Sequence, residues 1–191
     1  MTQWDRFFDD KIRELSRCRV VVDVGGGRPF QKHLSRYRSL FRKVDYVSVD
    51  FVHTYRPTVV GNIHALPIRS EIANGLICKA VLEHVYSPET VVAELYRVGK
   101  KKSKLLVYVP FLYPYHGNRD YKDYYRFTHD GLQYLFRRWS QVEIVAVRGY
   151  AETISNLLPK PIDKLSLPLA RIVDSLKPSI QTSGYYLFAV K

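Results

Sequence analysis

The chain has 191 residues, of which 46% are hydrophobic and 25% are charged. This length and composition suit one globular domain with its own core and exclude an intrinsically disordered chain. The 30 Lys and Arg residues outnumber the 18 Asp and Glu residues, and the net charge of +12 attracts nucleic acid, anionic lipid headgroups or acidic substrates without choosing among them. No apolar stretch reaches the roughly 18 residues that a membrane-spanning helix needs.

The two cysteines, Cys18 and Cys78, each lie next to an apolar run and are too few for a disulfide framework. Buried free thiols are therefore expected, and with them a reducing, cytoplasmic compartment. The polar, acidic N-terminus shows no pattern of a secretory signal.

The predicted elements alternate between helices and strands along the chain. Apolar spacing predicts an amphipathic N-terminal helix within residues 1–17. The β-branched run 19–24 predicts a strand that is buried on both faces and ends at three glycines. A stripe of apolar residues at helical spacing follows, and then a second strand at 45–50. Strand, glycine turn, helix and strand form a unit that predicts a parallel sheet.

The alternation continues to the end of the chain. Further strands are predicted at 58–60, 75–78, 105–109, 142–147 and 184–190, and further helices at 87–98 and 130–136.

Residues 149–183 interrupt this alternation and are predicted to be an insertion before the last strand. The insertion holds apolar residues at the spacing of an amphipathic helix that starts near Pro168: Leu169, Ile172, Val173 and Leu176. Such a helix can pack on the domain, cover a substrate site, form a dimer contact or lie on an anionic membrane, and the sequence leaves these alternatives and the oligomeric state open.

Three glycines (residues 25–27) follow the first predicted strand, and Asp50 ends the second. Glycine lets the backbone approach a ligand closely, and the turn after the first strand of an open parallel sheet is a ligand site. A carboxylate at the end of the second strand can bind both ribose hydroxyls. The dinucleotide pattern Gly-x-Gly-x-x-Gly is not met, because Phe30 replaces its third glycine. An acid, Asp23, also precedes the turn.

These segments resemble the class I S-adenosylmethionine-dependent methyltransferases, in particular the small-molecule, methyltransferase-11-like type. Asp23-x-Gly25-x-Gly27 after a valine run is similar to their first motif, and Val49-Asp50 to their ribose-binding acid. Four later segments are similar in order and spacing: 61–67, 79–85, 94–98 and 123–128. The resemblance covers about residues 18–148 and the last strand, and six segments in order are more specific than any one of them.

The resemblance implies a fold and a cofactor site. The fold is α/β, a Rossmann-like, doubly wound and mainly parallel seven-stranded sheet with an antiparallel last strand, in a single methyltransferase domain over residues 1–191. The residues that would bind S-adenosylmethionine are Asp23, Gly25, Gly26, Gly27, Asp50, Phe51, Asn62, Ile63, Lys79, Ala80 and Leu82. Pro29 stands where the family often has another glycine. Asn62 stands where it usually has an Asp, although the amide still offers an acceptor to adenine.

Methyl transfer is an in-line displacement at a sulfonium, so positioning and removal of water can supply most of the catalysis. A general base is needed only when the acceptor must lose a proton. His84, after the fourth strand, and His116, in the loop after the fifth, are the candidates for that base. The alternative for Glu83 and His84 is structural, with a salt bridge for Glu83 and a turn cap for His84.

The aromatic loop after the fifth strand is the candidate acceptor site, because aromatic rings can line a pocket by stacking. The residues predicted to bind the acceptor are Tyr113, Tyr115, Tyr124, Tyr125 and Arg126. The alternative is a lid that packs on the sheet. Carboxylates and histidines here have no recognised metal-ligand spacing, so no metal is expected: His116, Asp120, Asp123, His129 and Asp130.

The predicted function is methyl transfer from S-adenosylmethionine to an oxygen or nitrogen of a small-molecule or glycan-like acceptor. The net charge and an acid-free basic run over 24–44 keep an RNA methyltransferase as the alternative enzyme. The signatures for methylating base amino groups or ring carbons are absent after the fourth strand, so a nucleic-acid partner is not favoured. Pro29 and Asn62 motivate a third hypothesis, a non-catalytic cofactor-binding adaptor.

Overall fold

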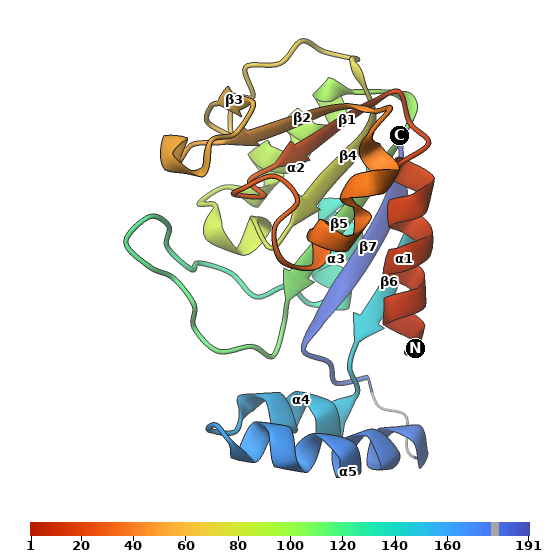
Figure 1. The fold of residues 1–191 in the computed structure, drawn as a ribbon, viewed down its shortest axis with the longest axis vertical. Coiled ribbons are helices and arrows are strands. Elements are labelled where there is room, and N and C mark those ends of the chain that lie inside the picture. The colour runs from red at the N-terminus through yellow and green to blue at the C-terminus, as the bar shows by residue number, and fades with distance from the viewer. Residues whose placement is uncertain (177–179) are drawn as a thin grey trace.

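The computed structural model describes residues 1–176 and 180–191, and its centre is a seven-stranded sheet (Figure 1). The strands are β1 Val20–Val24, β2 Asp45–Asp50, β3 Val59–Val60, β4 Ala73–Lys79, β5 Gly99–Pro110, β6 Ser140–Val147 and β7 Gly184–Val190. The α-helices are α1 Gln3–Leu15, α2 Pro88–Val98, α3 His129–Leu135, α4 Tyr150–Leu157 and α5 Ile162–Leu176. Three 3-10 segments are η1 Lys32–Phe41, η2 His53–Tyr55 and η3 Leu82–His84.

The strand order is β3-β2-β1-β4-β5-β7-β6. Strands β1 to β5 are parallel to one another, and β7 runs antiparallel to both β5 and β6. The predicted Rossmann-like sheet with its antiparallel last strand is therefore confirmed. From β1 the chain builds β2 and β3 on one side and β4 on the other, and this reversal of strand order opens a ligand crevice at the carboxyl ends of β1 and β4.

Both faces of the sheet are covered by helices, which explains why β1 is almost entirely valine. On one face, α1 and η1 pack Phe8 and Tyr37 into a core cluster with Val21 of the sheet. On the other face, α2 and α3 pack around Leu95 and Leu76. Figure 1 shows α1 and η1 in front of the strands. Among the described residues, no helix has the length and apolarity to cross a bilayer.

The segment after the glycine turn is helical, but it is not the α-helix that the sequence predicted. η1 is a 3-10 helix of 10 residues. Its most buried side chains are Leu34, Tyr37 and Phe41, and Leu40 is partly buried beside them. The predicted apolar stripe is therefore confirmed at these positions, and the difference lies in the tighter winding of the backbone.

The insertion before β7 forms a helical hairpin of α4 and α5, and its residues 177–179 lie outside the described part of the chain. The predicted start of the helix near Pro168 is wrong, because α5 begins at Ile162 and holds Pro168 in its interior. Pro168 is exposed, so water can bind the carbonyl that the missing N–H leaves free. The apolar stripe of α5 faces solvent rather than packing on the domain. Leu169 is 67% exposed.

Candidate active site

The glycine turn after β1 takes a backbone path that only glycine adopts without strain. Gly25 and Gly27 have φ angles of +68° and +67°, in the left-handed region. A Cβ atom on Gly25 would lie 2.7 Å from a methyl carbon of Val81. The Gly25 N–H donates to the carbonyl of Val49 at 2.7 Å, which holds the turn against the end of β2.

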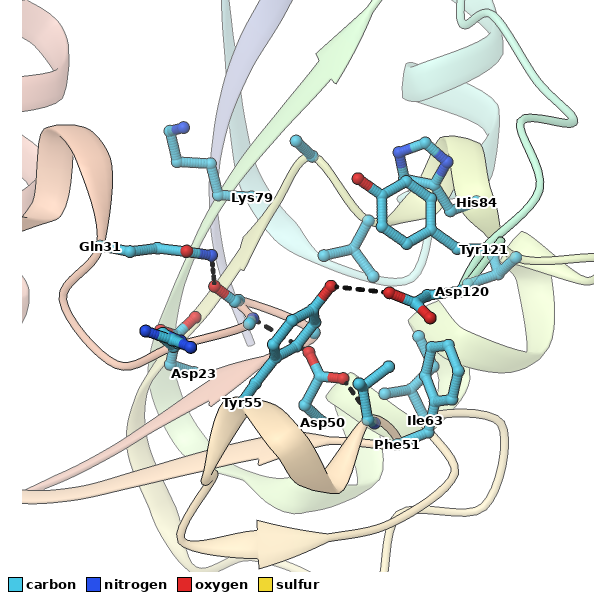
Figure 2. A pocket seen from close by; sticks show the side chains of 18 of the residues that line it. Asp23, Gln31, Asp50, Phe51, Tyr55, Ile63, Lys79, His84, Asp120 and Tyr121 are labelled. Atoms are coloured by element: carbon cyan, nitrogen blue, oxygen red, sulfur yellow. Dashed lines mark hydrogen bonds between the residues drawn. The ribbon is translucent and has the colours of Figure 1, made fainter. Parts of the chain in front are cut away.

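Asp50, the last residue of β2, is buried and fixes the two loops beside it. Its Oδ2 accepts from the Gly27 N–H and its Oδ1 from the Val52 N–H, both at 2.9 Å. Figure 2 shows this carboxylate between the glycine turn and Phe51. A carboxylate has about four acceptor positions. Asp50 therefore keeps capacity for two ribose hydroxyls after binding these two amides.

Asp23 lies inside β1 and is 1% exposed. Its Oδ2 accepts a hydrogen bond from the Tyr46 hydroxyl, whereas its Oδ1 has no partner among the described residues. Burial raises the pKa of Asp23 to about 6, and the Tyr46 hydrogen bond and the charge of Lys79 oppose that rise. A buried carboxylate oxygen without a partner, facing a cavity, fits a ligand that brings a cationic donor, and the ammonium of S-adenosylmethionine is such a donor.

A cavity of about 480 Å³ lies at the carboxyl ends of the strands and joins these groups to the loop after β5 (Figure 2). It falls within the roughly 300–1,000 Å³ of typical small-molecule sites. Twelve of the predicted site residues line it: Asp23, Gly25, Gly26, Gly27, Asp50, Phe51, Ile63, Lys79, Ala80, His84, His116 and Tyr124.

Two predicted cofactor residues lie outside the cavity lining. Asn62 is exposed, and its Oδ1 accepts from the His64 backbone N–H at 2.9 Å within a local turn. Leu82 is fully buried in the core cluster on the α2 face. Asn62 thus forms part of a turn, and the next residue, Ile63, is the one that lines the cavity.

Four predicted acceptor residues also lie outside the cavity lining. Tyr113 and Tyr115 are exposed, and the Tyr125 hydroxyl donates to the carbonyl of Tyr86 at 3.1 Å. Arg126 donates to both carboxylate oxygens of Asp123 at 2.6 and 2.7 Å. These side chains shape the loop rather than the cavity wall.

Asp123 is the centre of that loop, and its side chain has no exposed surface. Besides the two bonds from Arg126, it accepts the backbone N–H of His116 at 2.9 Å. The Arg126 guanidinium lowers the pKa of Asp123 to about 2. Asp123 therefore positions His116 over the cavity.

Several cavity residues were missed by the sequence reasoning. Gln31 donates from its side chain to the Gly26 carbonyl at 2.6 Å, which closes the turn from the η1 side. The Tyr55 hydroxyl donates to Asp120 at 3.2 Å, so the loop after β2 bridges to the loop after β5 (Figure 2). No local sequence signal marks this pair, because its members lie 65 positions apart.

Glu83, His84 and His116 form a cluster at one end of the cavity. Glu83 is fully buried, and its Oε1 lies 3.8 Å from His84 Nε2 and 3.6 Å from His116 Nε2. Both distances exceed a hydrogen bond, and neither Glu83 oxygen has a hydrogen-bond partner in the described part of the chain. The carboxylate of Glu83 raises the pKa of His116, against the effect of partial burial.

Comparison with known families supports the assignment that the motifs suggested. Residues 22–107 match the family model described as a methyltransferase domain. A search of curated protein sequences gave no significant match.

Solved structures with the same fold include an S-adenosylmethionine-dependent methyltransferase from Archaeoglobus fulgidus, at 14% identity and a TM-score of 0.64, over 97% of this chain and 92% of that one. Phosphoethanolamine N-methyltransferase 2 of Haemonchus contortus, crystallised with S-adenosylmethionine, has 11% identity and a TM-score of 0.58, over 91% and 48% of the chains. The 1,6-didemethyltoxoflavin-N1-methyltransferase of Burkholderia thailandensis, with its acceptor and S-adenosylhomocysteine bound, has 16% identity and a TM-score of 0.55, over 98% and 82%.

The family match and the shared fold are both those of class I S-adenosylmethionine-dependent methyltransferases. The family match spans β1 to the middle of β5, which carries the glycine turn, Asp50 and the Glu83–His84 pair. The recognition of the family from six sequence segments is thereby confirmed.

Proposed function

We propose that this enzyme methylates an oxygen or nitrogen of a small-molecule or glycan-like acceptor that enters the cavity beside His84 and His116. The observation that carries the proposal is the single cavity that connects Asp23, Asp50 and the glycine turn with these two histidines. S-adenosylmethionine supplies an electrophilic methyl group on its sulfonium. The chain's own residues bind the cofactor, orient the acceptor and exclude water.

The cofactor half of the cavity has a role for each group. Asp50 binds the ribose, the unpartnered Oδ1 of Asp23 accepts from the ammonium, and Phe51 and Ile63 flank the adenine. The two departures from the family pattern, Pro29 and Asn62, motivated the hypothesis of a non-catalytic adaptor, but they do not affect these cofactor contacts. Neither Asn62, which is exposed, nor Pro29, which is partly buried, lines the cavity.

The acceptor half is formed by His84, His116 and Tyr124, with Tyr121 beside them. A cavity of about 480 Å³ that also holds the cofactor leaves room for only a small reacting group. The Haemonchus and Burkholderia enzymes named above act on small molecules by their descriptions, which supports the same acceptor class here. An acceptor that must lose a proton meets the two histidine rings at this end, within reach of proton transfer.

Two measurements test the proposal. Isothermal titration with S-adenosylmethionine should give one binding site per chain, and absence of heat at high ligand concentration would overturn it. Release of S-adenosylhomocysteine is then followed with a panel of hydroxyl- and amine-bearing small molecules, oligosaccharides and RNA at low salt. Turnover with small molecules or glycans supports the acceptor class, and turnover with RNA alone contradicts it in favour of the RNA alternative.

A further inference from the structure

The cluster of Glu83, His84 and His116 has the arrangement of a metal site. Each residue offers one ligand atom, and the three atoms lie within 4.8 Å of one another. Glu83 and His84 are adjacent in η3, whereas His116 comes from the loop after β5. The fold brings them together because the backbone N–H groups of Tyr124 and Tyr125 both donate to the Glu83 carbonyl and so tie the loop to η3.

The two histidines present the same nitrogen to the cluster. His84 Nδ1 lies 2.6 Å from the carbonyl of Lys122, and His116 Nδ1 lies 3.1 Å from the carbonyl of Pro114. A carbonyl only accepts, so Nδ1 carries the proton in both rings. In the neutral ring, which is the form that binds a metal ion, each Nε2 then keeps its lone pair and faces Glu83. A ring N–H bound to a carbonyl or carboxylate is the usual second contact of a metal-binding histidine.

Glu83 supplies the independent observation that a cation belongs here. It has 0% exposure and both oxygens lack a partner in the described structure, while two lone pairs point at it. Three acceptors facing one another repel unless a positive charge lies between them. The separations of 3.6 and 3.8 Å are close to the roughly 3.4 Å that tetrahedral zinc bonds of about 2.1 Å require.

We propose that Glu83, His84 and His116 bind a divalent transition-metal ion, with zinc as the best match to two imidazoles and one carboxylate. Three protein ligands leave at least one coordination position open, and both histidines line the cavity. An acceptor hydroxyl bound there would pass its proton to water in the cavity more easily, since the ion would stabilise the alkoxide, and the alkoxide oxygen would then take the methyl group while the sulfonium leaves as a thioether. This last step rests on the proposed function, whereas binding of the ion does not. With the ion bound, the histidines hold it instead of accepting the proton themselves.

The test uses the untagged, chelator-treated full chain and two metal probes. Cobalt(II) titration should give a visible absorption band that saturates at one equivalent, and zinc should displace it. Magnesium, which prefers oxygen ligands, should not compete. His116→Ala should weaken cobalt binding by at least about 100-fold. His129→Ala is the matched control. His129 is exposed and lies outside the cluster, yet it also has a carboxylate neighbour, with its Nδ1 at 3.3 Å from Asp130 Oδ1.

Two results would overturn the metal site: no saturable cobalt band, or a band that His116→Ala leaves unchanged. Titration with S-adenosylmethionine on the same His116→Ala protein shows whether that variant folds and keeps its cofactor site. The cofactor titration needs no metal, so it fails on its own if the proposed function is wrong.

A second and separate observation concerns the α4–α5 hairpin. The large apolar residues of α5 recur on one solvent-facing stripe, and those of α4 and its end extend it. They are Ile154, Leu157, Leu158, Ile162, Leu165, Leu169, Ile172, Val173 and Leu176. Figure 1 shows the hairpin at the bottom of the view, apart from the strands. The residues that α5 turns toward α4 are different ones, among them Ala170 and Asp174.

The charges of the hairpin are sorted by exposure. The hairpin has three carboxylates. Asp174 accepts the N–H groups that begin α4 at 2.8 and 2.9 Å, the buried Glu152 pairs with Arg171 at 2.8 Å, and the partly exposed Asp163 accepts the Lys164 N–H at 2.8 Å. Among the described residues of the hairpin, the exposed charged side chains are all basic, namely Lys160, Lys164 and Arg171. An apolar stripe with basic flanks on a chain of net charge +12 matches an anionic lipid surface.

From this match we infer that the hairpin docks the enzyme on anionic membranes. Co-sedimentation with phosphatidylcholine vesicles, with and without phosphatidylglycerol, tests it on the full chain. Binding should require the anionic lipid and fall with added salt. Leu169→Glu should weaken binding at least about tenfold, whereas the control Tyr134→Glu should not. The two side chains are 67% and 66% exposed, and Tyr134 lies on α3.

Equal binding to neutral vesicles, no binding at all, or a Tyr134→Glu effect as large as that of Leu169→Glu would each overturn the inference. A dimer that Leu169→Glu dissociates, seen by gel filtration without any vesicle binding, would assign the stripe to a second copy of the chain instead.

Discussion

At the carboxyl edge of the sheet, buried polar atoms lack partners, whereas on the α4–α5 hairpin, apolar side chains lack cover. Asp23 and Glu83 are at most 1% exposed and carry unpartnered carboxylate oxygens in the described structure. On the hairpin, Leu165 and Leu176 are 78% and 79% exposed. Both arrangements are unfavourable in water, and each becomes favourable when the missing partner binds.

The difference between the two regions indicates what each one binds. A buried acceptor without a donor calls for a ligand that brings positive charge or hydrogen, such as an ammonium or a metal ion. An exposed apolar stripe with basic flanks calls for a large apolar, anionic surface. Between these regions, two core clusters bury apolar side chains against both faces of the sheet.

The largest effect should come from the same substitution made in the closed core and on the hairpin. Leu95→Ala on α2 removes a fully buried side chain and should reduce the free energy of unfolding by about 2–5 kcal/mol. Leu169→Ala on α5 should change it by less than about 0.5 kcal/mol, because that side chain is already exposed. Urea unfolding measures both. Similar losses would show that the stripe of α5 is covered in solution.

Asp50→Ala should weaken binding of S-adenosylmethionine by at least about 100-fold, because hydrogen bonds to a charged group contribute about 1.5–3 kcal/mol each. The domain should remain folded. Asp45→Ala is the matched control, because Asp45 is the same residue type at the opposite end of β2 and is exposed there. Isothermal titration gives the affinities and circular dichroism the fold. Unchanged affinity would mean that the ribose binds elsewhere.

Binding of the cofactor should also depend on pH through Asp23. Its pKa of about 6 lies above the ordinary value of 3.8, so the folded protein loses stability as pH rises between these values. The ammonium needs the ionised form, so affinity should fall about tenfold from pH 7 to about pH 5. Asp23→Asn should bind weakly at every pH. An affinity that does not change with pH in the unmodified protein would show that Asp23 does not take part in cofactor binding.

A smaller effect tests the strain at the cluster of Glu83, His84 and His116. Glu83→Gln replaces an unpartnered acceptor with an amide that can donate to the Nε2 lone pairs of both histidines. The metal-free variant should be about 1 kcal/mol more stable than the parent in urea unfolding. A loss of stability would show instead that protonated histidines hold Glu83 in place.

Much of the sheet could be predicted from the sequence, because its signals are local. The bounds of β2 and β7 agree with the predicted 45–50 and 184–190. The alternation of apolar runs and helical stripes predicted the layers, and the glycine turn with Asp50 predicted the ligand edge. The start of α5 was missed because an interior proline was taken as the first turn of the helix.

The acceptor side could not be predicted, because it depends on the path of residues 111–128. This loop has no regular structure, and its shape follows from contacts between distant residues such as Asp120 with Tyr55. Counting aromatic residues therefore selected Tyr113 and Tyr115, which are exposed and do not line the cavity. A salt bridge was one of the alternatives left open for Glu83, and the burial of both its oxygens is a three-dimensional property that the sequence does not show.

The bridge between Tyr55 and Asp120 has a kinetic consequence. A partly exposed hydrogen bond of this kind contributes about 1 kcal/mol. It therefore lowers the population of the state with the two loops apart by a factor of about five. Tyr55→Phe should accordingly change the rate of cofactor exchange, followed by stopped-flow displacement, by no more than about fivefold. This hydrogen bond alone thus adds only a small barrier to separation of the two loops, so it should not limit the departure of the spent cofactor.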